Sequence, residues 1–379
     1  MNTDKNQHTD RGANLRANLR ANLRAGLRII WAIAVKDIVE ALKNRNILIN
    51  IILLPLMIVF YKWLPTLYNP EGVRIVVYDA GPSRLAIELA NSAQFDLREA
   101  HSHQELAEKL DAMPMAVLGL AIPAGFDQAL SSGQPPTLDG VVMHWVSHDK
   151  AAELQALFEK QFTEWTGYPV QINLQGNALT PFPDTMGPAR NASISITVVI
   201  VLSGLMIVPL LLIEEKRTKT LDAMRISPAN PGQIVIGKAL VGLFYGLATI
   251  GTALLVNRAI VVQWGIAILS ALSGLSLSVA AGLAMGVFFE RKTQVSSWGM
   301  LIFTALLVPV FLNGIEPILP RAVQTVFDWI PTVALAKAFR FAFSHGATPA
   351  QMAVNLGLVL GSALLVFAVV AWQIRRSDL

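Results

Sequence analysis

Residues 214–228 read Glu-Glu-Lys-Arg-Thr-Lys-Thr-Leu-Asp-Ala-Met-Arg-Ile-Ser-Pro, and Gly237-Lys238 follow them. This stretch lies between two long apolar runs, yet it holds seven ionisable side chains from Glu214 to Arg225. A chain in lipid must satisfy its own backbone hydrogen bonds and keep its charges out of the hydrocarbon. The pattern therefore predicts a short polar helix outside a bilayer, between two membrane spans, in a place where a partner protein can push on it.

The composition is typical of a membrane protein. The chain is 53% hydrophobic and 15% charged, whereas soluble domains average about a quarter charged residues. Cysteine is absent, which excludes disulfides, zinc–thiolate sites, iron–sulfur ligation and thiol catalysis. The fold class we predict is a polytopic α-helical membrane protein with six transmembrane helices. Each of the six apolar runs is near the ~20 residues that a bilayer requires: Ile47–Leu64, Ile194–Ile213, Ile234–Val256, Gly265–Phe289, Val295–Leu312 and Met352–Ile374.

The distribution of charge predicts the orientation in the membrane. Residues 1–46 hold nine basic and four acidic side chains, whereas residues 66–190 hold seven basic and fifteen acidic ones. The positive-inside rule then places both termini in the cytoplasm and residues 66–190 outside, in agreement with an even number of spans. The polar, basic start of the chain is unlike a secretory signal, so we expect the first span to be an uncleaved anchor.

Residues 66–190 carry the pattern of an α/β domain inserted between the first and second spans, because strand-like and helix-like stretches alternate. Ser102 is a plausible helix cap, with Glu105 three residues later. Asn177–Arg190 is expected to be the linker back to the membrane. The predicted strands are Val73–Tyr78, Phe95–Glu99, Met115–Ile122, Thr137–Val146 and Val170–Leu174, and the predicted helices are Ser83–Ala93, His103–Met113 and Lys150–Trp165.

The rest of the chain is divided by the same reasoning. Residues 1–46 are expected to form a cytoplasmic basic tail and an amphipathic helix on the inner leaflet, although the Ala-Asn-Leu-Arg repeat of residues 13–28 is also compatible with partial disorder. Residues 47–65 form the first span. Residues 191–379 form the membrane domain, with a cytoplasmic coupling loop at 214–233. Two short helices, Ala322–Trp329 and Val333–Phe343, are expected as interfacial or re-entrant helices on the outer side, within residues 313–351.

Two motifs resemble known sites. Gly232 to Ala239 nearly match the phosphate loop, but Ala239 stands where the magnesium-binding hydroxyl belongs and no strand precedes the motif, so we reject a nucleotide site. His101, His103, His144 and His148 have metal-ligand spacing. We interpret them as surface histidines of a solvated domain, with metal binding as the alternative.

Charges near membrane depth mark functional residues by default. Most of the candidates lie at span ends, where long side chains reach the interface. Glu316 lies where the fifth span gives way to the short outer helices, which makes it the candidate gate residue, although we favour a structural or interfacial role for it. The other candidates are Lys62, Arg258, Glu290, Arg321, Asp328, Lys337 and Arg340. Gly282 and Gly286 form a G-x3-G face for helix packing, expected within the chain rather than in a dimer.

The coupling loop resembles that of ABC-2 family ABC transporter permeases, in the exporter branch that carries a large outer domain between spans one and two. Members share Glu-Lys/Arg-Glu-x-Gly-Thr-Leu-Glu, then Ser/Thr-Pro, then Gly-Lys. Here Glu214–Arg217, Thr220-Leu221-Asp222, Ser227-Pro228 and Gly237-Lys238 stand in those places. Lys219 replaces the usual Gly and Asp222 the usual Glu, which puts the detailed contacts of the loop in doubt but not its short polar helix.

The resemblance implies a non-catalytic half-transporter in a plasma or bacterial inner membrane. It would pair with a second copy or a homologous permease, and it would move substrate outward when a cytosolic ATPase closes on ATP. No cofactor is expected on this chain, because ATP and magnesium would bind the partner. The expected docking residues are Glu214, Glu215, Arg217, Thr220, Leu221, Met224 and Pro228. Membrane lipid and a periplasmic adaptor are further candidate partners, whereas nucleic acid is not expected. The leading alternative is a membrane sensor with an outer ligand-binding domain; an ion-driven transporter and a membrane enzyme are also considered.

Overall fold

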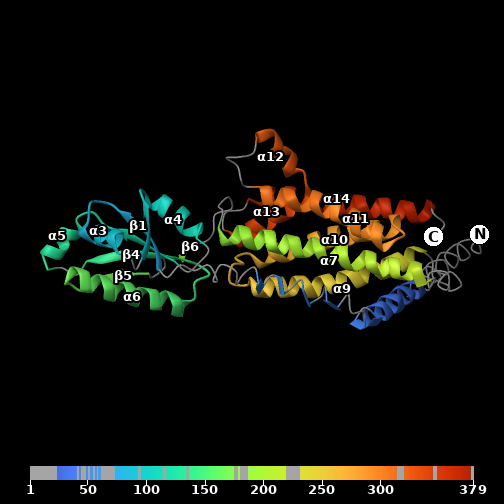
Figure 1. The fold of residues 1–379 in the computed structure, drawn as a ribbon, viewed down its shortest axis with the longest axis horizontal. Helices are drawn as coiled ribbons and strands as arrows, with labels where there is room; N and C mark the ends of the chain where they lie inside the picture. The colour runs from blue at the N-terminus through green and yellow to red at the C-terminus, as the bar shows by residue number, and fades with distance from the viewer. Residues whose placement is uncertain are drawn as a thin grey trace, which may run out of the picture.

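The computed structural model describes residues 24–40, 42–43, 48–49, 52–53, 56–57, 59–60, 73–92, 95–113, 117–133, 136–174, 178–179, 187–218, 231–313, 320–344 and 348–376. These residues form two parts that lie end to end (Figure 1). One is an α/β region between Val73 and Leu179, and the other is a bundle of long helices. We call the end of the bundle near the α/β region the sheet end, and the opposite end the far end.

Five helices of the described residues are long and apolar enough to cross a membrane. They are α7 (Pro188–Thr218), α9 (Pro231–Val256), α10 (Trp264–Phe288), α11 (Lys292–Leu312) and α14 (Pro349–Arg376). They coincide with five of the six predicted spans. The predicted first span, Ile47–Leu64, lies largely outside the described residues, so the predicted number of six is not tested.

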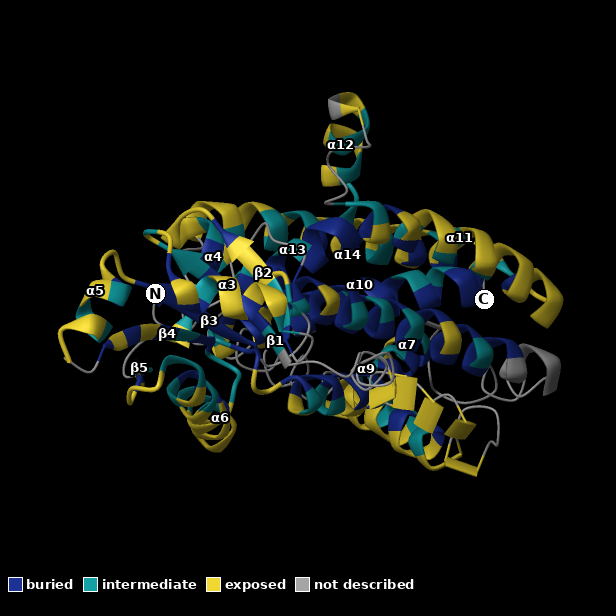
Figure 2. Ribbon diagram, turned by 60° about the vertical axis from the view of Figure 1, so that its left-hand side comes forward, coloured by how far each residue is buried: buried dark blue, intermediate teal, exposed yellow. Residues whose placement is uncertain are grey.

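Helices α7 and α10 form the centre of the bundle because small residues let their backbones approach closely. A Cβ atom on Gly282 would lie 2.2 Å from the carbonyl oxygen of Gly204, and one on Gly204 would lie 2.3 Å from the backbone of Ser278. The most apolar stretches of α7 and α10 are 78% and 72% buried within the chain, against 22% for α11 and 17% for α14 (Figure 2). The G-x3-G face is therefore used inside the chain, as predicted.

Two short helices follow α11. Helix α13 (Pro331–Phe343) is buried in the bundle, whereas α12 (Arg321–Asp328) stands off it (Figure 1). The two are joined by an ion pair of 2.7 Å between Lys337 and Asp328. Both helices were predicted, within a residue or two at each end. Proline at the first turn of α13 suits a helix start, where the missing N–H leaves no bond unmade.

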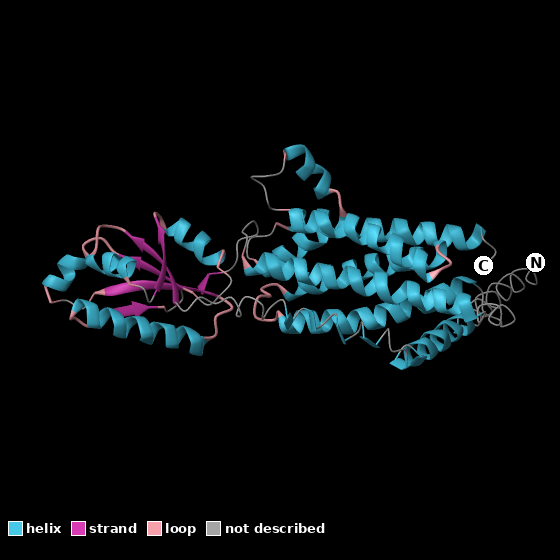
Figure 3. Ribbon diagram, viewed as in Figure 1, coloured by secondary structure: helices cyan, strands magenta, loops and turns pink. Residues whose placement is uncertain are grey.

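The α/β region is built on one main sheet with the strand order β2-β1-β3-β4-β5 (Figure 3). The strands are β1 (Val73–Asp79), β2 (Phe95–Ala100), β3 (Leu118–Ile122), β4 (Thr137–Met143) and β5 (Gln171–Asn173). Strands β1, β2 and β3 are parallel, and β4 runs antiparallel to β3. Each of these five strands overlaps a predicted one.

Helices cover both faces of this sheet. Helices α3 (Arg84–Asn91) and α6 (His148–Thr166) bury the face that includes Ile75 and Leu120, and α4 (His103–Asp111) covers the face that includes Val76. Strand β3 lies between the two layers and is buried along its whole length. This explains why its sequence is apolar throughout instead of alternating.

The start of α4 is capped as its sequence predicts. The Ser102 hydroxyl accepts a hydrogen bond from the N–H of Glu105 at 3.0 Å, and the Glu105 carboxylate accepts one from the N–H of His101 at 2.7 Å. The bond from Lys109 and the one from the His101 backbone lower the pKa of the Glu105 carboxyl. Both effects stabilise the ionised carboxylate at the positive end of the helix.

The sequence interpretation of two segments was wrong. Helix α5 (Phe126–Ser131) was not predicted, and it is anchored by the buried ring of Phe126. The linker expected at Asn177–Arg190 is shorter than predicted. Strand β6 (Ala178–Leu179) pairs with β4, and α7 already begins at Pro188. A two-residue strand has no readable periodicity, because its pairing is decided by β4.

The α/β region is attached to the bundle through the end of β4. The His144 ring nitrogen Nε2 lies 3.2 Å from the carbonyl oxygen of Ile260, in the turn between α9 and α10. Trp145 packs against the apolar core of the bundle. The backbone N–H of Gln263 in turn donates to the carbonyl of Ala342 at 2.8 Å. Strand β4, this turn and α13 are therefore linked at the sheet end.

Replacing Gly282 by Ala is expected to lower the thermal unfolding midpoint of the detergent-solubilised protein, because the new methyl group meets the backbone of Gly204. We expect a cost of about 1–3 kcal/mol, as for other overpacked sites. Gly357→Ala in α14 is the matched control, since a Cβ there has no neighbour within 4 Å. Equal midpoints for the two variants would contradict close packing of α7 on α10.

Candidate functional site

At the far end of the bundle, the helix of residues 24–40, here called the N-terminal helix, packs across α7 and α9 (blue in Figure 1). Its buried Ala34 belongs to one apolar cluster with Ile207 and Leu211 of α7 and Val241 and Tyr245 of α9. Helices α7 and α9 are the two helices joined by the predicted coupling loop. The N-terminal helix therefore contacts both helices that flank the loop. We call this contact the far-end junction.

A buried ion pair lies at the centre of the far-end junction. Lys238 Nζ lies 2.5 Å from Asp37 Oδ2, and the two side chains are only 1% and 2% exposed. The Tyr245 hydroxyl donates a hydrogen bond of 2.5 Å to the carbonyl of Ile38, one residue after Asp37. Removing one partner of such a buried pair typically costs about 3–5 kcal/mol, because the other charge is left without compensation.

Three of the docking residues proposed from the sequence belong to α7, one of the helices of this junction. The backbone of Glu214, Glu215 and Arg217 is helical, within the last turns of α7. Their side chains, and all of Thr220, Leu221, Met224 and Pro228, lie outside the described residues. The described chain resumes at Pro231, two turns before Lys238.

Sequence reasoning missed the role of Asp37. It met Lys238 in a rejected phosphate loop and in the Gly-Lys element of the family resemblance, without a partner for its charge. In the structure the Lys238 ammonium is bonded to Asp37 rather than open to an incoming phosphate. A Cβ on Gly237 would lie 2.8 Å from the Cγ2 atom of Ile33, so glycine lets the two helices touch. One sequence signal could have revealed the role of Asp37. Its carboxylate lies on the same helical face as the apolar residues Ile30, Ile33 and Ala34.

A second polar cluster lies at the sheet end, where α11 ends. Arg190 of α7 donates hydrogen bonds to the carbonyls of Phe311 and Asn313 at 3.1 and 2.7 Å. Arg340 of α13 reaches the Asn313 side-chain oxygen at 3.4 Å. Both guanidinium side chains belong to buried residues, and cations stabilise the negative end of a helix. Arg190, Arg340 and Asn313 thus hold α7, α11 and α13 together.

Glu316, the candidate gate residue from the sequence, lies outside the described residues.

The bundle contains an apolar cavity of about 380 Å³ between α7, α10, α11, α13 and α14. Leu205, Met285 and Leu306 are among its lining residues, and Thr332 contributes a hydroxyl that donates to the carbonyl of Leu306. Because such polar groups are already bonded to the backbone, the cavity wall is essentially hydrocarbon. An acyl chain or an aromatic group fits this chemistry, whereas a polar solute would lose its hydrogen bonds there.

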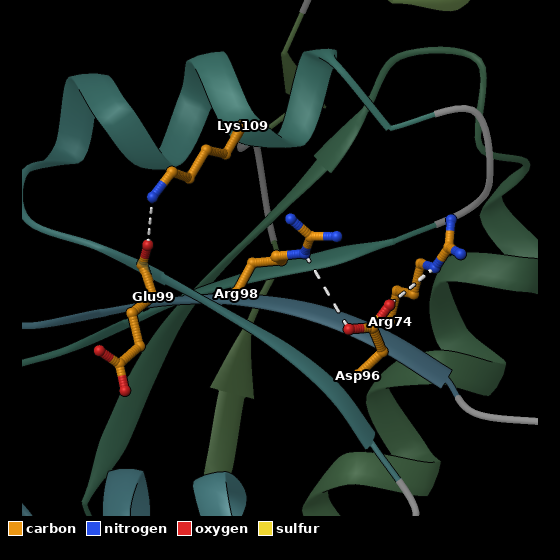
Figure 4. A network of polar contacts seen from close by, with 5 residues as sticks. All are labelled: Arg74, Asp96, Arg98, Glu99 and Lys109. Carbon is orange, nitrogen blue, oxygen red and sulfur yellow. Dashed lines mark hydrogen bonds and ion pairs between the residues drawn. The ribbon is translucent and has the colours of Figure 1, made fainter.

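Some of the charged residues of the α/β region form ion pairs and hydrogen bonds with one another. Figure 4 shows Asp96, on the edge strand β2, between Arg74 at 3.0 Å and Arg98 at 4.0 Å. Lys109 donates to the backbone carbonyl of Glu99 at 2.5 Å. Charges on an edge strand discourage pairing with another chain. Among the described residues, no three His, Asp or Glu side chains are grouped as a metal ion would require.

These features define a polytopic membrane protein: an apolar helical bundle, charged junctions at its two ends, and an α/β region attached to one end. A family model described as "ABC-2 family transporter protein" matches residues 45–372, and the chain belongs to this family. It is thus the membrane permease component of an ABC transporter. Subunits of this family work with a cytosolic ATPase and are normally not catalytic themselves. A search among curated proteins found no matching sequence.

Replacing Arg190 by Leu is expected to destabilise the sheet end, because the last carbonyls of α11 lose two charge-assisted hydrogen bonds. We expect a loss of about 2–3 kcal/mol, measured as a lower thermal unfolding midpoint in detergent. The control is Arg258→Leu, which removes an exposed arginine at the same end of the bundle. If both variants unfold with the wild-type midpoint, Arg190 does not hold α11.

Proposed function

We propose that this chain is the membrane subunit of an ABC exporter and that a cytosolic ATPase docks on its coupling loop, residues 214–233. ATP-driven closure of the ATPase would push the loop and rock the spans, so that substrate leaves on the side of the α/β region. The observation that carries this proposal is the far-end junction. There a buried ion pair joins the N-terminal helix to α9, and one apolar cluster joins that helix to both α7 and α9, so a push on the loop is passed to the bundle.

The distribution of charge supports a cytoplasmic far end. Arg291 and Lys292 lie there, at the start of α11, and Arg375 and Arg376 end α14. The α/β region at the other end is rich in acidic residues. The free side of the N-terminal helix adds to this argument. It combines exposed Trp31 and Val35 with exposed Arg24 and Arg28, a combination that suits the anionic inner leaflet of a plasma membrane.

The uncovered face of α11 supports assembly with a second copy. This helix leaves most of its surface outside the chain. Ser296, Ser297 and Thr304 are exposed on it, next to Met300 and Leu301. Small and hydroxyl-bearing residues on a membrane helix favour close contact with another helix. A dimer would place one coupling loop under each of two ATPase subunits.

The proposal is tested by purifying the chain from its native membrane in mild detergent and identifying what binds it. We expect a stoichiometric ATPase. Reversing the charges with Glu215→Lys and Arg217→Glu should reduce the bound ATPase about tenfold or more and abolish transport, because each reversed charge would face a like charge on the partner. Membrane insertion should be unchanged.

The matched control reverses the charges of two exposed residues at the same end of the bundle, with Glu290→Lys and Arg291→Glu. This control variant should keep its ATPase. Full ATPase binding and full transport by the Glu215→Lys/Arg217→Glu variant would overturn the assignment of the coupling loop.

A further inference from the structure

The Asp37–Lys238 pair joins two parts of the chain that are 201 positions apart. Asp37 lies in the N-terminal helix, which leads toward the predicted first span, and Lys238 lies near the start of α9. The same contact includes the Tyr245–Ile38 hydrogen bond and the close approach of Gly237 to Ile33. The N-terminal helix is therefore attached at several points along its length.

The N-terminal helix has two adjacent apolar sides, and only one of them is docked. Ala34 is 1% exposed on the docked side, together with the partly buried Ile30, Ile33 and Ile38. Trp31, Val35 and Val39 lie on the neighbouring side and are between 41% and 65% exposed, and Leu27, two turns before Ala34, is also exposed. Apolar contact is not directional, so either side of this helix is able to pack against α7 and α9.

The buried pair decides which side docks. If the helix rotated about its axis to dock the neighbouring side, Asp37 would leave Lys238 buried without its carboxylate, a strongly unfavourable state. Sliding by one turn would separate the two charges in the same way. A single buried polar group is known to set the register of packed helices. In this chain the pair sets both the rotation and the register of the N-terminal helix.

We propose that Asp37 and Lys238 are positioning residues that fix the N-terminal helix to α7 and α9 as one mechanical unit, and that this unit is required to couple ATP hydrolysis to transport. The proposal rests on the function proposed above. Movement at the coupling loop is then passed to α7, α9 and the N-terminal helix together, and from that helix toward the first span.

The chain contains no cysteine, so an introduced cysteine reports on one position. The first measurement is the rate of maleimide labelling of an Ala34→Cys variant in membranes, with Asp37 intact, with Asp37→Asn, and with the exchange Asp37→Lys/Lys238→Asp. We expect Asp37→Asn to raise the labelling rate about tenfold or more, because the docked face opens to solvent. The exchange, which restores an ion pair, should return the rate toward that of the parent.

The second measurement is the ATPase activity of the purified complex in lipid nanodiscs, relative to the ATPase alone. We expect Asp37→Asn and Lys238→Met to keep the ATPase bound but to reduce the permease-dependent change in its activity about fivefold or more, within the usual range of coupling between two sites. The control is Lys36→Met/Glu40→Gln, which removes an exposed ion pair from the same helix. This control should match the wild type.

A covalent bond should replace the ion pair if its role is positioning. A Cβ on Gly237 would lie 3.1 Å from the Ile33 Cβ, against about 3.8 Å in an average disulfide. Ile33→Cys/Gly237→Cys therefore needs only a small shift. Oxidising this pair in the Asp37→Asn background should restore the coupled ATPase activity, and reduction should abolish it again. Rescue of this kind separates positioning from a general loss of stability.

Several results would overturn the proposal. One is wild-type labelling in the Asp37→Asn variant, and another is full coupling in a variant whose helix is shown by labelling to be released. Failure of the disulfide to restore coupling would do the same. If the wild-type chain binds no ATPase, the function proposed above fails instead, and the labelling rates alone decide whether Asp37 positions the helix.

Discussion

Hydrocarbon does not solvate charge, so a charged side chain inside this bundle must find its partner within the protein. The buried lysine and arginines described above satisfy this rule at the two ends of the bundle. Lys238 is bonded to a carboxylate at the far end, and Arg190 to helix-end carbonyls at the sheet end. In each case the partner is distant in sequence. The charges that the membrane makes costly are therefore also the contacts that hold remote segments together.

Between these two ends the contacts are of a different kind. The centre of α7 and α10 is held by glycine, serine and apolar side chains, and the nearby cavity is lined by hydrocarbon. Such surfaces have no directional bond that must break before one helix shifts against another. A bundle with directional polar contacts at both ends and non-directional packing between them is suited to rocking motion under load, because its ends stay assembled while its middle adjusts.

Much of this architecture is readable from the sequence, and the exceptions have physical causes. Five spans and most elements of the α/β region are long enough for their periodicity to show, and Ser102 with Glu105 marks the start of α4 through local capping chemistry. Strand β6 was missed because two residues carry no period. The partner of Lys238 was missed because no local rule connects residues 201 positions apart. The α4 cap involves neighbouring residues, whereas the ion pair depends on how three helices pack, which is a property of the tertiary structure.

The composition of the N-terminal helix shows why an ion pair is retained where apolar packing would hold equally well. A well-packed apolar pair of similar volume is often at least as stable as a buried ion pair, so stability alone does not explain Asp37 and Lys238. The helix also leaves Trp31 and Val35 exposed on the side next to the docked one, and their apolar side chains could pack on the same surface as Ile33 and Ala34. A contact that strongly penalises the rotated orientation selects the docked side. The buried charge is therefore best explained as a source of specificity, and a helix with a second apolar side is where such specificity is needed most.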